Sequence, residues 1–308
     1  MTDKRTGDAH WVAVDWGTTH LRLWVLDSNN AVRRQIETDQ GMAQLQPADY
    51  EAVLLELLAQ DLRQDQPLDV ICCGMVGARQ AWQEAPYAPC PTPPPNAKHA
   101  THVTTHDPRV KVYLLPGIKQ ASPPDVMRGE ETQIAGFIAR NADFDGVLCL
   151  PGTHSKWVHI SAREVISFQT FMTGELFALL SKGSVLRHSI SAGGWDDEMF
   201  TNAINDAMAR PAAVAAQLFA LRAQSLIADL SPEAARARLS GLLIGLELAA
   251  ARPYWLGTQV AILGDTAVAK AYCKALAAQA TQITMASTEL MTLDGLKAAY
   301  ATLPERTK

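Results

Sequence analysis

The sequence predicts an α/β protein made of two similar domains, and three observations support this prediction. The 308-residue chain is long enough for about two domains. Residues 11–27 alternate apolar and other residues on either side of the turn Asp15-Trp-Gly-Thr-Thr19, which is typical of strand, tight turn and strand. The same arrangement returns at residues 146–160 around Gly152 and Thr153. We therefore expect one such hairpin in each domain.

The first turn carries groups that suit phosphate and a divalent cation. Gly17 lets the backbone approach a ligand closely, and amides helped by the hydroxyls of Thr18 and Thr19 can surround phosphate oxygens. Asp15 would direct a carboxylate to the same place, which suits Mg²⁺, and Arg22 could pair with a phosphate or an acidic substrate. An ordinary hairpin explains this stretch alone about equally well; the second turn favours the functional interpretation.

Composition excludes several classes of protein. The formal charge of −5 and the isoelectric point near 5.9 give no electrostatic basis for binding nucleic acid. The longest apolar windows, such as residues 242–251, are shorter than the roughly 20 residues that a membrane-spanning helix needs, and the N-terminus lacks the apolar core of a signal peptide. Cys72, Cys73 and Cys149 lie in apolar runs, so we expect reduced thiols in a cytoplasmic protein with no membrane partner.

The rest of the first domain is predicted to combine a helix with further strands. Residues 47–64 repeat apolar residues at helical spacing, and residues 68–73 are typical of a buried strand. That strand ends in a Gly-rich loop containing Gly74, Met75 and Arg79, which would line a cleft; a plain turn is the alternative. Residues 86–107 are rich in Pro and His, but no Cys or acid completes a metal-ligand set there, and we assign no site to them.

A helix is predicted to begin near Gly129, after a Pro-rich linker. Glu130 and Glu131 fall in its first turn, where the helix dipole favours negative charge whatever the function. The functional interpretation is that one of them, or Asp125, is a general base beside a cleft.

The second turn consists of Gly152, Thr153, His154, Ser155 and Lys156, between a buried strand at 147–150 and another at 157–160. The lysine adds a cation that suits phosphate. Two such hairpins are expected if two similar domains face each other across a nucleotide, each contributing one turn that holds phosphate.

The remaining chain is predicted to be mainly helical. Thr173 is placed to cap one helix, residues 196–229 and 231–252 are predicted to be helical, and Gly241-x-x-x-Gly245 indicates close helix packing. A strand at 258–263 leads through Gly264 and Asp265 into a helix at 267–278. A Gly at such a turn lets adenine or ribose lie against the backbone, although an ordinary βα turn explains it equally well.

These motifs together resemble a known pattern. Asp15-Trp-Gly-Thr-Thr19 resembles the first phosphate motif of the actin/hexokinase/Hsp70 superfamily, Gly152-Thr153 its second phosphate motif, and Gly264-Asp265 its adenosine motif. Within that superfamily the chain looks like the 2-dehydro-3-deoxygalactonokinase family over nearly its whole length. The stretches that carry this likeness are Asp15-Trp-Gly-Thr-Thr-His-Leu-Arg22, Gly74-Met-Val-Gly-Ala-Arg79, Asp125-Val-Met-Arg-Gly-Glu-Glu-Thr-Gln133, Pro151-Gly-Thr-His-Ser-Lys-Trp157 and Phe171-Met-Thr-Gly-Glu-Leu-Phe177.

The resemblance implies two ribonuclease-H-like (actin-like ATPase) domains flanking a nucleotide cleft. We expect the first at residues 1–118, joined by a C-terminal helix at 288–308, and the second at residues 119–287. The second turn lacks the acid of many superfamily members, which leaves Asp15 as the main carboxylate on the metal side.

The resemblance also implies a reaction, the ATP-dependent phosphorylation of the 6-hydroxyl of 2-dehydro-3-deoxy-D-galactonate with Mg²⁺. Related sugar kinases place their base shortly before the second phosphate turn, where Glu130 falls, so we prefer it to Asp125 and Glu131. The substrate carboxylate should meet Arg79 or Arg128. The family likeness extends the substrate side to Gly74, Met75, Thr173 and Glu175.

Two rival functions belong to other classes. A phosphatase acting on polyphosphate or a guanosine phosphate would need a wide basic channel, and the acidic composition argues against it. A non-catalytic nucleotide-dependent scaffold, as in actin, would not need a loop with Arg128 and paired acids. The only other partner that we expect is a second copy of the chain in a homodimer, which the sequence does not test.

Overall fold

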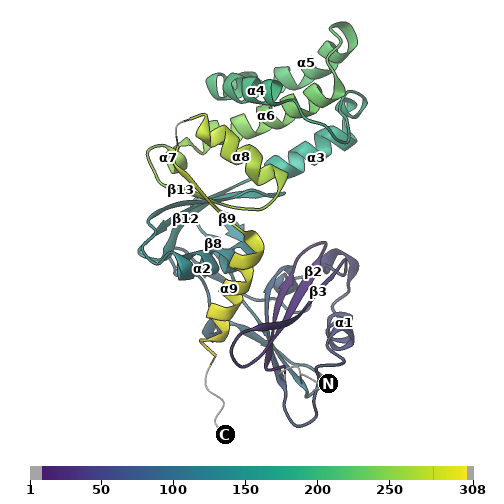
Figure 1. The fold of residues 1–308 in the computed structure, drawn as a ribbon, viewed down its shortest axis with the longest axis vertical. Coiled ribbons are helices and arrows are strands. Elements are labelled where there is room, and N and C mark those ends of the chain that lie inside the picture. Colours follow the sequence, from purple (N-terminus) through teal and green to yellow (C-terminus); the bar gives the residue numbers. More distant parts are fainter. Residues whose placement is uncertain (1–8, 280, 304–308) are drawn as a thin grey trace, which may run out of the picture. The chain divides into compact units, whose positions relative to one another are not determined.

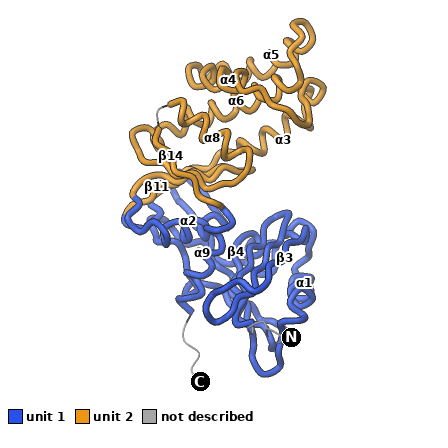
Figure 2. Tube along the Cα trace, viewed as in Figure 1, with its two compact units in different colours: residues 1–144, 162–166, 288–308 blue, residues 145–161, 167–287 orange. Residues whose placement is uncertain are grey.

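A computed structural model describes residues 9–279 and 281–303 of the chain. The chain divides into two compact units, shown in different colours in Figure 2. Unit 1 contains the residues up to 144, residues 162–166 and those from 288 onward, and unit 2 contains residues 145–161 and 167–287. Both units are α/β, which confirms the predicted fold class.

The main sheet of unit 1 has six strands in the order β3-β2-β1-β4-β7-β6; β2 and β3 are labelled in Figure 1. Their bounds are β1 Trp11–Trp16, β2 Leu21–Leu26, β3 Val32–Thr38, β4 Leu68–Gly74, β6 Thr101–Val103 and β7 Val110–Leu114. β1 pairs antiparallel with β2, and it pairs parallel with β4. The predicted first hairpin is therefore confirmed.

Both faces of this sheet are buried, as the alternation of side chains along β1 requires. Val12 and Val14 face the core that includes Leu54 of helix α1 (Tyr50–Leu57), whereas Trp11 lies in the core that contains Leu296 of helix α9 (Thr288–Tyr300). α1 is shorter than the predicted helix at 47–64. α9 covers most of the predicted terminal helix, and residues 304–308 of that prediction lie outside the described residues.

A small three-stranded sheet, in the order β5-β8-β9, leads into helix α2 (Glu130–Arg140). Its strands are β5 Tyr87–Pro89, β8 Gly117–Gln120 and β9 Asp125–Met127. The expected domain boundary after residue 118 falls inside β8, and β9 and α2 belong to unit 1. α2 crosses α9 at backbone contact, since a Cβ on Gly136 would lie 1.9 Å from the Met291 oxygen and one on Gly295 would lie 1.9 Å from the Thr132 oxygen.

The sheet of unit 2 repeats the arrangement of unit 1 with five strands in the order β12-β11-β10-β13-β14. The strands are β10 Gly146–Leu150, β11 Ser155–Ser161, β12 Glu164–Phe171, β13 Val260–Leu263 and β14 Ile283–Ala286. β10 pairs antiparallel with β11 and parallel with β13, just as β1 pairs with β2 and β4. The second predicted hairpin is confirmed, and so is the similarity of the two domains.

The helices of unit 2 are α3 Thr173–Gly183, α4 Asp197–Ala209, α5 Val214–Ile227, α6 Pro232–Ala250, α7 Arg252–Trp255 and α8 Ala267–Ala277. The helical region predicted at 196–229 is two helices, because Pro211 interrupts it. α6 contacts α4 closely at Gly241 and Gly245, where a Cβ would lie 2.5 Å and 2.8 Å from backbone oxygens of α4. This confirms the packing role predicted for the two glycines. None of the described helices has the length and apolar character to cross a membrane.

Candidate active site

The candidate site in unit 1 centres on Asp15, at the end of β1. Cys73 lies beside it on β4 and donates a hydrogen bond from Sγ to Asp15 Oδ1 (3.8 Å). The next residue, Gly74, has a φ of +88°, and a Cβ there would lie 2.7 Å from the Trp16 oxygen. Glycine is therefore required where β4 turns away next to the carboxylate.

Asp15 is a half-buried acid with one cation and one further acid among its neighbouring charges. Burial raises the pKa of Asp15, the Arg22 guanidinium lowers it, and the negative charge of Glu130 raises it again. Arg22 also pairs with Glu37 (Nη2 to Oε1, 3.4 Å), while its buried Nε has no hydrogen-bond partner among the described residues. Asp15 therefore lies where an additional cation would stabilise its ionised form.

The turn after β1 is shaped by a second segment. Thr18 and Thr19 are exposed, and their carbonyls accept hydrogen bonds from the amides of Ala43 (2.9 Å) and Gly41 (3.1 Å). A Cβ on Gly41 would lie 2.3 Å from the Thr19 carbonyl carbon, so only glycine fits. Sequence reasoning did not identify Gly41, because its role depends on a contact between segments that the pattern does not link.

Of the three candidate bases, Glu130 and Asp125 are half-buried and Glu131 is buried. Glu130, the first residue of α2, is half-buried and accepts a hydrogen bond from the Arg128 amide at Oε2 (3.0 Å). Glu131 is 1% exposed and accepts one from the Gly129 amide (2.7 Å). Asp125, on β9, accepts one from the Val126 amide (2.7 Å). Exposure therefore argues against Glu131 and leaves both Glu130 and Asp125 accessible.

The start of α2 backs directly onto the end of β4. Gly129 has a φ of +106°, and a Cβ there would lie 3.4 Å from the Cα of Gly74. The two glycines let two backbones approach, which brings the Glu130 charge close enough to Asp15 to raise its pKa. Two acids from segments far apart in the sequence therefore lie together within unit 1.

Stability should depend on pH through Glu131. Burial, reinforced by the charge of Glu130, raises the pKa of Glu131 from 4.5 to about 8. Between those values the unfolded chain releases a proton that the folded protein keeps, so its stability falls as the pH rises, by up to about 1.4 kcal/mol per pH unit for this one group. Glu131→Gln removes this dependence. Urea unfolding at pH 5 and pH 8 should show the variant gaining stability over the wild type as the pH rises.

The control for this experiment is Glu37→Gln, which removes a largely exposed carboxylate on β3. It should follow the wild type within a few tenths of a kcal/mol at both pH values. A Glu131→Gln protein whose stability relative to the wild type is the same at pH 5 and pH 8 would contradict the assigned pKa.

Two arginines were predicted to meet a substrate carboxylate, and the structure separates them. Arg128 lies 4.2 Å over the Tyr87 ring and donates from Nη2 to the Ala85 carbonyl (2.7 Å). Its Nη1 has no partner among the described residues, and a Cβ on Gly77 would lie 2.8 Å from it. Arg79 has an 84% exposed side chain paired with Glu84 (3.3 Å). Arg128 is thus fixed in place, whereas Arg79 is largely in solvent.

In unit 2, the second turn is joined to the start of α3. The Glu175 amide donates to the Thr153 carbonyl (3.0 Å), and a Cβ on Gly174 would lie 2.3 Å from the Gly152 oxygen. His154 Nε2 and Glu175 Oε2 are 2.6 Å apart. These contacts give the turn and the N-terminus of α3 one fixed arrangement.

Ser155 and Lys156 begin β11 and are buried, in contrast to the exposed turn position that the sequence suggested. The Ser155 hydroxyl lies 2.9 Å from the Tyr272 hydroxyl, and Lys156 Nζ donates to the His154 carbonyl (3.4 Å). Of the five predicted turn residues, Gly152, Thr153 and His154 remain exposed.

A buried carboxylate that sequence reasoning missed lies behind this turn. Glu247 of α6 accepts hydrogen bonds from Trp157 Nε1 (2.7 Å), the Tyr272 hydroxyl (2.6 Å) and the Thr173 hydroxyl. Burial raises its pKa, and these bonds lower it. The carboxylate connects β11, α3 and α8 to α6. Its position in the sequence offered a signal, since it is a single acid within the apolar run 242–251.

Unit 2 also contains a cavity of about 900 Å³. The second turn, α3, the loop before α4, α6 and α8 all contribute to its walls, with lining residues that include Thr153, Thr173, Trp195, Ser240, Thr266 and Lys274. The predicted adenosine motif lies directly before this wall, since Thr266 follows Gly264 and Asp265 and caps α8 by accepting from the Ala269 amide (3.4 Å). Asp265 accepts from the Ser287 hydroxyl (3.0 Å).

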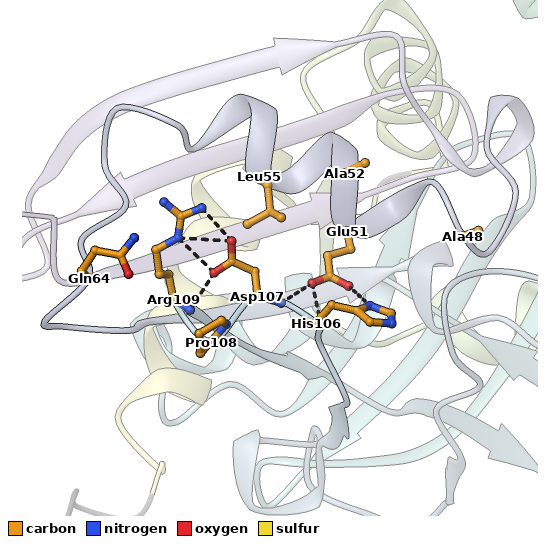
Figure 3. Close-up of a pocket in the computed structure, with 9 residues that line it drawn as sticks. All are labelled: Ala48, Glu51, Ala52, Leu55, Gln64, His106, Asp107, Pro108 and Arg109. Carbon is orange, nitrogen blue, oxygen red and sulfur yellow. Dashed lines mark hydrogen bonds and ion pairs between the residues drawn. The ribbon is translucent and has the colours of Figure 1, made fainter.

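A second hollow, of about 600 Å³, lies in unit 1 between α1 and the loop before β7 (Figure 3). Its charged groups are already paired. Glu51 accepts from the amides of His106 (2.7 Å) and Asp107 (2.8 Å), and Arg109 pairs with Asp107 (2.6 Å). We assign no ligand to it. No group of three or more His, Cys, Asp or Glu in the described part of the chain could hold a metal ion by itself.

Comparisons with known proteins agree with one another. The model of the family described as 2-keto-3-deoxy-galactonokinase matches residues 15–299. The chain is 35% identical to a probable 2-dehydro-3-deoxygalactonokinase of Rhizobium meliloti (strain 1021), over 96% of this chain and 97% of that protein. It is 31% identical to the 2-dehydro-3-deoxygalactonokinase of Escherichia coli (strain K12), over 90% and 92%. A crystal structure from Sinorhizobium meliloti, provisionally assigned the same name, superposes with a TM-score of 0.89 at 35% identity, over 96% of this chain and 100% of that one.

Proposed function

Because the chain belongs to the 2-keto-3-deoxy-galactonokinase family, we propose that it transfers the γ-phosphate of ATP to the 6-hydroxyl of 2-dehydro-3-deoxy-D-galactonate, with Asp15 and Glu130 at the reacting groups. The protein is a sugar-acid kinase of galactonate catabolism, a carbohydrate kinase with the actin-like ATPase fold.

One observation supports this assignment most directly. The start of α2 lies beside the end of β4, where a Cβ on Gly129 would lie 3.4 Å from the Cα of Gly74, and the negative charge of Glu130 raises the pKa of Asp15. Phosphoryl transfer needs mainly positioning and charge neutralisation. Two half-buried carboxylates near each other suit a base that accepts the hydroxyl proton and a group that binds the cation.

Magnesium is the cation that this donor set fits. The pKa of Asp15 is raised, so a bound cation would stabilise its ionised form. Proteins usually bind Mg²⁺ through one or two acids together with water and phosphates. Bound Mg²⁺ would neutralise charge on the phosphates of ATP. Asp15 would hold the ion, through water, and keep it on the side of the site where Glu130 meets the sugar.

The nucleotide is assigned to groups in both units. Gly17, Thr18 and Thr19 in the first turn, with Arg22, and Gly152, Thr153 and His154 in the second would bind phosphate oxygens. Ser155 and Lys156 would support the second turn from β11, because their side chains are buried. Gly264 and Asp265 would lie beside the ribose or base, since the cavity of unit 2 begins at the next residue.

The sugar acid is assigned to unit 1. Arg128 is the better candidate for its carboxylate, because Tyr87 and Ala85 already hold the guanidinium in place and less side-chain freedom is lost on binding. Arg79, Gly74 and Met75 would complete this side. Thr173 and Glu175 were expected on the substrate side. Because Thr173 donates to Glu247 and Glu175 pairs with His154, we propose that Thr173 and Glu175 support the second turn instead.

The test is an ADP-release assay with a panel of sugar acids, read together with ³¹P NMR of the product. We expect turnover on 2-dehydro-3-deoxy-D-galactonate and a phosphate monoester at C6. A panel including the gluco epimer measures stereochemical preference, and sugars that lack the carboxylate measure its contribution. Lack of turnover on every 2-keto-3-deoxy acid would overturn the proposal, and strong hydrolysis of polyphosphate or guanosine phosphates would favour the phosphatase alternative.

A further inference from the structure

Trp195 differs from the other tryptophans of the chain. It lies in the loop before α4, lines the cavity of unit 2 and is 43% exposed. Five others, Trp11, Trp16, Trp24, Trp157 and Trp255, are at most 2% exposed. A large aromatic side chain that is exposed to solvent beside a cavity indicates a binding surface.

The indole is fixed although it is exposed. Its Nε1 donates to Asp197 Oδ1 (3.0 Å), and Lys274 Nζ lies 2.7 Å from the same oxygen. The ring also packs against Phe200, with centroids 4.9 Å apart and an angle of 48°. Two residues of α4 therefore hold the indole, and Lys274 of α8 pairs with the Asp197 carboxylate that accepts its hydrogen bond. A side chain fixed before binding loses little conformational freedom when a ligand arrives.

The loop that carries Trp195 has a defined path as well. Gly194 has a φ of +81°, and a Cβ there would lie 2.3 Å from Glu233 Cγ of α6. Only glycine allows the loop to approach α6 in this way, so the position of the next residue is set by the backbone.

Helix α8 connects this surface with the predicted nucleotide-binding turn. Thr266, at its N-cap, and Lys274, beside Trp195, both line the cavity. Eight residues of α-helix span about 12 Å, which is room for a ribose beside the turn and a base between that ribose and the indole. A base attached to that ribose would reach Trp195.

We propose that Trp195 stacks on the purine base of the nucleotide substrate. This inference rests on the proposed function, which assigns ATP to the cavity, and it adds the residue that binds the base. Stacking uses the π face that every base has. Trp195 therefore supplies affinity for ATP and GTP alike and does not distinguish the two.

The test compares Trp195→Ala, Trp195→Phe and the matched control Phe219→Ala. Phe219 is an aromatic side chain of α5 with 67% exposure that is not among the described residues lining the cavity. Trp195→Ala should raise the Kd of ATP, and its KM, about tenfold to a hundredfold, raise the Kd of GTP by the same factor, and leave kcat and the KM of the sugar acid nearly unchanged. Trp195→Phe should retain most of the affinity, and Phe219→Ala all of it.

Tryptophan fluorescence gives an independent measurement in the same proteins. Nucleotide should quench the wild type, and Trp195→Phe should abolish most of the quenching. An unchanged Kd for ATP in Trp195→Ala, or undiminished quenching in Trp195→Phe, overturns the stacking. A wild type that binds nucleotide with this quenching but phosphorylates no sugar acid overturns the proposed function and leaves the stacking supported.

Discussion

Asp15→Asn is expected to reduce kcat about a hundredfold or more while the protein stays folded. The substitution keeps the shape of the side chain and removes the charge that would hold Mg²⁺, and a single lost electrostatic contact to a transition state typically has an effect of this size. Steady-state kinetics at saturating ATP, repeated over a range of Mg²⁺ concentrations, measures the effect. Turnover close to that of the wild type at ordinary Mg²⁺ would contradict the role of Asp15.

Stability separates this effect from unfolding. Burial raises the pKa of Asp15, so the ionised carboxylate disfavours the folded state without its cation. Asp15→Asn should therefore have a Tm equal to or above that of the wild type in the absence of Mg²⁺. An inactive variant with a sharply lower Tm would attribute the lost turnover to unfolding.

Glu130→Gln is expected to reduce the rate of phosphoryl transfer by about 10²–10⁴-fold, the usual contribution of a general base. The amide cannot accept the hydroxyl proton, but it can still accept the hydrogen bond from the Arg128 amide, so the start of α2 should keep its structure. Rapid-quench measurement of a single turnover, together with the Kd of ATP, isolates the chemical step. The Kd should change little.

The matched controls are Asp125→Asn and Glu131→Gln, each of which removes a neighbouring acid. Both should retain a single-turnover rate much closer to the wild type, because the acid whose charge raises the pKa of Asp15 is Glu130 and because Glu131 is buried. A full rate in Glu130→Gln with a slow Asp125→Asn would transfer the role of base to Asp125.

The sequence predicted those parts of the protein that depend on local pattern. Alternation along residues 11–27 and 146–160 identified both hairpins, and the spacing of Gly241 and Gly245 identified the close contact of α6. The turns could be recognised because glycine and threonine occur there for reasons of backbone geometry. Each of these features is decided by residues close together in the chain.

Features that depend on distant segments could not be read from the pattern. Ser155 and Lys156 looked like exposed turn residues, yet they are buried because β11 begins earlier than the turn chemistry suggested. The role of Glu247 depends on donors from three other elements. The role of Trp195 depends on a cavity to whose walls α6 and α8 contribute. Family likeness assigned separate roles to Asp15 and Glu130, but their proximity, with Gly129 packed beside Gly74, required the structure.

The crossing of α2 and α9 determines when unit 1 can complete its folding during synthesis. Since Gly136 and Gly295 lie at close backbone contacts between α2 and α9, the helix that begins with Glu130 obtains this packing partner only after α9 has left the ribosome. Unit 2 lies in the sequence between α2 and α9 and is interrupted only by residues 162–166, so it can fold earlier. A nascent or truncated chain lacking α9 therefore keeps Glu130, the proposed general base, on a helix without this packing partner.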